Sequence, residues 1–148
     1  MAYWNWDSSL SVGIDIIDNQ HQRIITYLNE LSIAQTDKNQ KRVTQVLVGL
    51  VDYTMTHFSF EEDLMSQAGY PISIAHKQVH ESFIERIKNY QSQHESGTDV
   101  TRKLMSELRL WLTNHIKYED KKYVPYVNKF INKEQSWVSK KLKYFFGV

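Results

Sequence analysis

The sequence predicts an all-α protein: an antiparallel up-down-up-down four-helix bundle with an N-terminal arm and a short C-terminal helical tail. Two observations support this prediction. The 148 residues include only five Gly and two Pro, so turns are few and the segments between them are long. Within these segments apolar residues recur at the spacing of a helix that buries one face. Four such segments with short connections pack most simply as antiparallel neighbours.

The first two helices are predicted at about residues 18–36 and 40–67. Asp18 is suited to be the N-cap of the first helix because its short carboxylate can accept a free backbone N–H. Gly49 lies inside the second helix, where it costs about 1 kcal/mol relative to Ala. The apolar stripe of the first helix consists of Ile24, Ile25, Leu28, Leu31 and Ile33.

The third helix is predicted at about residues 72–95 and the fourth from Asp99 onward, until Pro125 breaks or kinks it. A short helix is expected after Pro125. The arm, residues 1–17, shows weak strand-like alternation near its end, and its Trp4 and Trp6 are expected to pack over the end of the bundle.

Residues 1–133, arm included, are expected to form one domain, and residues 134–148 a basic amphipathic tail. The tail interleaves Trp137, Leu142 and Phe145 with lysines. A final helix docked on the bundle is the favoured interpretation, because the aromatic rings would otherwise be exposed. A membrane surface or a protein partner is the alternative for such a helix.

Composition excludes several classes of function. The formal net charge is only +1, too little to attract a phosphate backbone, so nucleic acid is not expected as a partner. Cysteine is absent, which excludes disulfides, Fe–S clusters and thiol nucleophiles. The first residues lack the features of a secretory signal, and no apolar run reaches the length of a membrane span, so a cytoplasmic protein is expected.

Histidine is the most informative residue type, because five of the six histidines are spread over all four predicted helices. Two pairs have i, i+4 spacing, which places both side chains on one helix face. A third pair, His115 and Asp120, has i, i+5 spacing and needs a π-type turn to share a face. The candidate metal ligands are His21, His57, Glu61, His76, His80, His115 and Asp120.

Counting residues from each turn, at about 1.5 Å rise per residue, places all seven candidates in one layer of the bundle. Unpaired polar groups are costly to bury there, whereas a metal site accounts for them. Seven ligands exceed the needs of one ion, so two ions bridged by the carboxylates are predicted. Imidazole with carboxylate suits Fe, Zn, Mn or Cu, so residue chemistry alone leaves the metal open.

The ligand motifs resemble those of the hemerythrin family in its single-domain bacterial form, over about residues 6–127. All seven ligand positions match the pattern of that family. The resemblance rests on Val12-Gly13, the run Ile17-Asp18-Asn19-Gln20-His21, the pairs His57-x-x-x-Glu61 and His76-x-x-x-His80, and Trp111-Leu112-x-x-His115-x-x-x-x-Asp120.

This resemblance implies two non-haem Fe ions with an oxo or hydroxo bridge, and O2 as the ligand. One iron would be held by His76, His80 and His115, and the other by His21 and His57. Glu61 and Asp120 would bridge the two ions. The iron with two histidines would keep an open position for O2.

Reversible O2 binding, for transport, storage or scavenging, is therefore the predicted function, and a catalytic role is not expected. Two alternatives stay open: an O2- or redox-sensing module that acts through a docked partner, and a di-iron enzyme acting on peroxide or nitric oxide. Four residues near the ligands are expected to line the O2 pocket, although plain core packing explains them equally well. They are Ile24, Phe58, Trp111 and Leu112.

Two further residues lie near this pattern in the sequence. Tyr123 follows Asp120 by three residues, so its hydroxyl could hydrogen-bond beside the site, or its ring could only fill the core. His94 lies outside the ligand pattern, next to a Gly-containing turn, and is expected at the surface.

Overall fold

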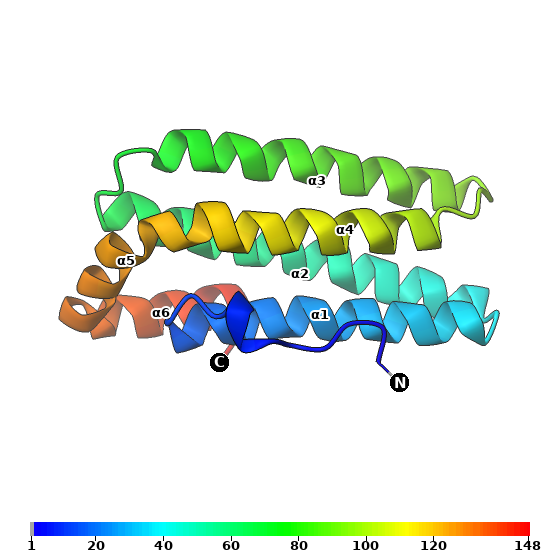
Figure 1. Ribbon diagram of the computed structural model, residues 1–148, viewed down its shortest axis with the longest axis horizontal. Helices are drawn as coiled ribbons and strands as arrows, with labels where there is room; N and C mark the ends of the chain where they lie inside the picture. Colours follow the sequence, from blue (N-terminus) through cyan, green and yellow to red (C-terminus); the bar gives the residue numbers. More distant parts are fainter. Residues whose placement is uncertain (1) are drawn as a thin grey trace.

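The structure, a computed structural model, describes residues 2–148 and is built from helices (Figure 1). Four long helices lie side by side, and a bent C-terminal extension closes one end of the bundle. The elements in order are η1 (Ser8–Leu10), α1 (Asp15–Thr36), α2 (Gln40–Gln67), α3 (Ser73–Glu95), α4 (Thr101–His115), η2 (Ile116–Asp120), α5 (Lys121–Lys133) and α6 (Gln135–Phe146).

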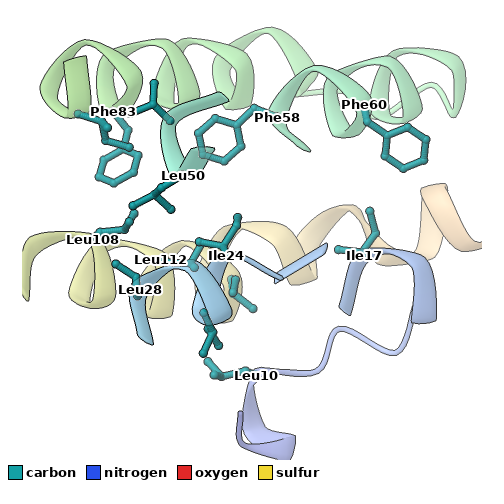
Figure 2. Close-up of a cluster of buried hydrophobic side chains, with 14 of the residues drawn as sticks. Leu10, Ile17, Ile24, Leu28, Leu50, Phe58, Phe60, Phe83, Leu108 and Leu112 are labelled. Carbon is teal, nitrogen blue, oxygen red and sulfur yellow. The ribbon is translucent and has the colours of Figure 1, made fainter. Parts of the chain in front are cut away.

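The up-down-up-down arrangement predicted from the sequence is confirmed. Helix α1 packs on α2, α2 on α3, α3 on α4, and α4 returns to α1. Most apolar side chains of these helices point into one core, with Ile24, Leu112 and Phe58 near its middle (Figure 2). None of the helices described within residues 2–148 is long and apolar enough to cross a membrane.

Asp18 does not cap α1, contrary to the prediction, because the helix begins three residues earlier at Asp15. The Asp18 carboxylate instead accepts the backbone N–H of Val12 at 2.9 Å and the hydroxyl of Ser11. Ile14 occupies the N-cap position without a side-chain hydrogen bond. The carboxylate thus attaches the arm to the helix that follows it.

The arm is neither a strand nor a cover for the bundle end in the part of the chain that the structure describes. It contains the short 3-10 helix η1 and runs along the side of α1 and α4 (Figure 1). Trp4 is buried, and its backbone N–H and C=O bond the amide of Asn29 on α1 at 2.8 and 2.9 Å. The Arg109 guanidinium on α4 donates to the carbonyl of Tyr3 at 3.1 Å. These polar contacts hold the arm alongside the helices.

The π-type turn required by the His115–Asp120 spacing is present: η2 is a π-helical segment between α4 and α5. The predicted break at Pro125 is wrong: Pro125 lies inside α5, and α4 already ends at His115, where η2 follows. Pro125 is the fifth residue of α5, so its missing N–H leaves the carbonyl of Lys121 without the usual helical hydrogen bond. Figure 1 shows that α5 turns away from α4 and crosses the end of the bundle.

The tail forms α6, which returns along α2 (Figure 1). Val138 is buried, while Trp137, Leu142, Phe145 and Phe146 are half-buried against the core. Lys141 pairs with Asp63 of α2 at 3.1 Å. The docked helix favoured from the sequence is therefore the arrangement in the structure.

Candidate metal centre

All seven candidate ligands meet in the interior of the bundle. Each is at most 4% exposed, although they come from α1, α2, α3, α4 and η2. One ligand atom from each of Glu61, His76, His80, His115 and Asp120 lies within 4.8 Å of the others. His21 and His57 form a second group that shares Glu61 with the first. The depth in the bundle predicted from residue counting therefore agrees with the structure.

The carboxylate of Glu61 lies between the two groups. Its Oε1 atom is 3.1 Å from Nε2 of His80 and 3.4 Å from Nε2 of His76. Its Oε2 atom is 3.5 Å from Nε2 of His57. One oxygen therefore faces the three-histidine group and the other faces the two-histidine group.

Asp120 repeats this arrangement from the opposite helix. Its Oδ1 atom is 3.0 Å from Nε2 of His115 and 3.1 Å from Nε2 of His76. Its Oδ2 atom is 3.3 Å from Nε2 of His21. The π-helical segment makes this orientation available, because five residues of regular α-helix would turn Asp120 about 140° away from His115.

These separations match the ligand edges of a metal site. A first-row ion bonded to nitrogen and oxygen at about 2.1 Å has adjacent octahedral ligands about 3.0 Å apart. The Nε2 atoms of His80 and His115, for example, lie 3.0 Å apart. Nitrogen lone pairs facing each other at that distance need a cation or a proton between them. The spacing of the side chains therefore fits bound metal.

Unsatisfied polar atoms also fit a metal. Buried atoms without a hydrogen-bond partner among the described residues are costly, and in this layer they face one another. They are Nε2 of His21, His57 and His76, Oε1 of Glu61, and both carboxylate oxygens of Asp120. A pair of cations at this position would satisfy the whole set.

The far sides of two histidine rings are held by hydrogen bonds to polar side chains. Nδ1 of His57 donates to the Gln20 side-chain oxygen at 2.6 Å, and Nδ1 of His80 donates to Glu62 at 2.8 Å. The Glu119 carboxylate lies 3.4 Å from Nδ1 of His115, close to the ring but not hydrogen-bonded to it. A proton held at Nδ1 leaves Nε2 as the metal-binding nitrogen.

Sequence reasoning did not assign these roles to Gln20, Glu62 and Glu119. Glu62 follows Glu61 directly, and Glu119 has i, i+4 spacing to His115, so the available signal was a carboxylate near a candidate ligand. Gln20 precedes His21 on α1 but supports His57 on α2. That contact depends on the packing of two helices, which no spacing within one segment reveals.

Tyr123 has the hydrogen bond that the sequence analysis left open. Its side chain is fully buried, and its hydroxyl donates to Oε2 of Glu61 at 2.8 Å. Burial, together with the nearby Glu61 and Asp120 carboxylates, raises the pKa of this phenol well above its ordinary value. Tyr123 therefore stays protonated and serves as a donor to the carboxylate.

Burial and neighbouring charges set the protonation of the cluster. Burial alone would raise the pKa of Asp120, but His115, His21 and His76 outweigh it and hold that pKa well below its ordinary value. Burial lowers the pKa of His57 to about 3, so its ring is neutral. For His76 the Asp120 and Glu61 carboxylates overcome burial and raise the pKa to about 10. Without metal His76 holds a proton, which a bound cation would replace.

Aromatic rings cover the three-histidine group. Phe58 stacks on His80 with centroids 3.8 Å apart, and Trp111 stacks on His115 at 4.4 Å. Leu112 and Ile24 are both buried in the core (Figure 2). All four residues expected to line an O2 pocket therefore lie in the interior or beside ligand rings. His94 is partly exposed and bonds Thr44 at 2.9 Å, away from the cluster, as expected.

Comparison with known proteins identifies the family. The model of the hemerythrin HHE cation binding domain matches residues 12–127. The chain belongs to the hemerythrin family. A bacteriohemerythrin of Stenotrophomonas maltophilia is 46% identical over 99% of this chain and its own full length. One of Pseudomonas aeruginosa is 42% identical over the same shares.

Solved hemerythrins have the same fold. A crystal structure of wild-type hemerythrin superposes with a TM-score of 0.80 at 29% identity, covering 85% of this chain and 98% of that one. A mutant hemerythrin superposes with the same score over 86% of this chain. The family membership implied by the resemblance of the ligand motifs is thus confirmed.

Proposed function

We propose that this hemerythrin-family protein binds O2 reversibly at a non-haem di-iron centre, as a carrier, store or scavenger. His76, His80 and His115 hold one iron, and His21 and His57 hold the other. Glu61 and Asp120 bridge the two. When bound, a pair of iron(II) ions supplies the two electrons that O2 takes up on binding and returns on release.

The observation that carries this proposal is the chemistry of the donor set. Five neutral imidazoles and two bridging carboxylates give the centre little negative charge. Di-iron oxidases of the ferritin-like class use mostly carboxylates, whose charge favours high-valent iron. An imidazole-rich set supports reversible binding instead.

The surrounding residues have distinct tasks under this proposal. Gln20 and Glu62 fix the orientation of His57 and His80 through Nδ1. Tyr123 donates to Glu61 and so keeps that carboxylate from taking up a proton. Leu112 and Ile24 are both buried and would help to keep water away from the centre, because a dry apolar wall slows proton transfer to a bound ligand.

Metal analysis combined with an anaerobic O2 titration followed by absorption tests the proposal. We expect two iron atoms per chain and a spectral change that reverses when O2 is removed. One zinc, or no metal after anaerobic loading, would contradict the di-iron assignment. Rapid turnover of peroxide or nitric oxide, with no reversible O2 adduct, would support the enzyme alternative.

A further inference from the structure

A large pocket lies outside the metal centre, between α1, α2 and α6. Its volume is about 700 Å³, within the range of small-molecule sites. None of the seven candidate ligands lines it. Its wall includes Gln20, Arg23, Tyr27, Tyr53, Leu142 and Phe146.

Aromatic side chains form the apolar part of this wall. The rings of Tyr27 and Tyr53 have centroids 5.8 Å apart, and those of Tyr53 and Phe146 are 5.6 Å apart. Gly49 permits the close approach of Tyr27, since a Cβ at that position would lie 2.9 Å from the Tyr27 ring. This contact gives a reason for a glycine inside α2. The wall suits a flat apolar body.

The polar part of the wall includes several donors beside the Asp52 carboxylate. The Gln20 oxygen is used by His57, which leaves the Gln20 amide N–H groups without a partner among the described residues, in a side chain only 5% exposed. The Tyr27 hydroxyl accepts from Arg23 at 3.5 Å, so its own proton stays available. Burial raises the pKa of Tyr53 to about 12, which keeps that hydroxyl protonated.

The charged side chains of the wall indicate which ligand group the donors would bind. The arginine ion pairs within residues 2–148 are Arg42–Glu30 and Arg86–Glu107, and neither involves Arg23. The Arg23 guanidinium is therefore available to an anion. Asp52 also borders the pocket, and its charge weakens the binding of any anion there and disfavours a second acidic group.

We propose that this pocket binds a small molecule with an aromatic body and a single carboxylate. The body packs against Tyr53 and Phe146, and the carboxylate accepts from Arg23 and the neighbouring donors. Such a ligand would rest against Gln20, the residue that orients His57. This site is separate from O2 binding and goes beyond the proposed function.

Isothermal titration of the metal-loaded protein with 1-naphthoate tests the proposal. We expect one site per chain with a dissociation constant of about 1 mM or tighter. The neutral 1-naphthamide should bind about fivefold more weakly, and 1-naphthylmethylamine more weakly still, because neither offers a carboxylate to Arg23. Equal binding of all three compounds would refute the carboxylate preference.

One matched pair of arginine variants and one further variant, at Asp52, locate the site. Arg23→Gln should weaken naphthoate binding about fivefold, whereas Arg42→Gln, an exposed arginine outside the pocket, should not change it. Asp52→Asn should strengthen binding, since it removes the repelling charge. No heat above that of dilution, or equal loss in both arginine variants, overturns the proposal. Heat is measured without O2, so the result is independent of O2 binding.

Discussion

The Tyr123 hydroxyl offers a sharp test of how the bundle supports its metal centre. Tyr123→Phe removes one oxygen from a fully buried ring and leaves the packing volume nearly unchanged. The lost bond is the 2.8 Å donation to the Glu61 carboxylate. A hydrogen bond to a charged group contributes about 1.5 to 3 kcal/mol, which for a chain of this size lowers the melting temperature by about 5 to 9 °C.

Thermal melts of the iron-loaded variant measure this loss, with Tyr126→Phe as the control. Tyr126 lies on the same helix but is 42% exposed, so its hydroxyl is free to bond water. Loss of the donor also makes Glu61 easier to protonate, so iron should leave at a higher pH than in the parent protein. If both variants melt within about 1 °C of the parent, Tyr123 only fills space and its assigned role is wrong.

The remaining predictions concern the ligands, the apolar wall and the tail. His57→Ala should lose at least one iron, because the remaining buried ligands cannot complete the centre, whereas His94→Ala should keep both; metal analysis in which the two results are exchanged would refute the assignment. Leu112→Ala should speed autoxidation with iron content intact, since water gains access to the centre, and an unchanged rate measured by absorption would make Leu112 ordinary core. Truncation after Lys133 should preserve iron and O2 binding but lower the melting temperature, because the half-buried rings of α6 lose their contact with α2. Equal melting temperatures, with binding to anionic vesicles by the full-length chain alone, would instead support the membrane alternative for the tail.

Most of the candidate metal centre could be predicted from the sequence because the positions of its residues depend on their spacing along helices. The His57–Glu61 and His76–His80 pairs define faces, and helix lengths define depth. The i, i+5 interval of His115 and Asp120 required a π-type turn, which the structure contains. These features depend on geometry within one helix, and each predicted helix is long enough for its periodic pattern to be recognised.

The parts that escaped prediction depend on contacts between segments. Asp18 reads as an N-cap in sequence, yet its carboxylate is used by the arm at Val12 and Ser11. The path of the arm is decided by Asn29 and Arg109, polar residues with no periodic signature. Gln20 likewise becomes important only when α1 packs on α2.

The π-helical segment has a consequence for everything that follows it in the chain. One extra residue in a helical turn rotates all later residues by about 100° relative to the continuation of α4. Tyr123 shares the face of Asp120 because it follows that residue by three positions of the helix. Deleting Lys117 would shorten the interval from His115 to Asp120 to i, i+4, which a regular α-helix places on one face, so the deletion should remove the π-type turn and leave Asp120 on the side of His115. The π-type turn thus accommodates one additional residue and still leaves Asp120 on the same side of the helix as His115.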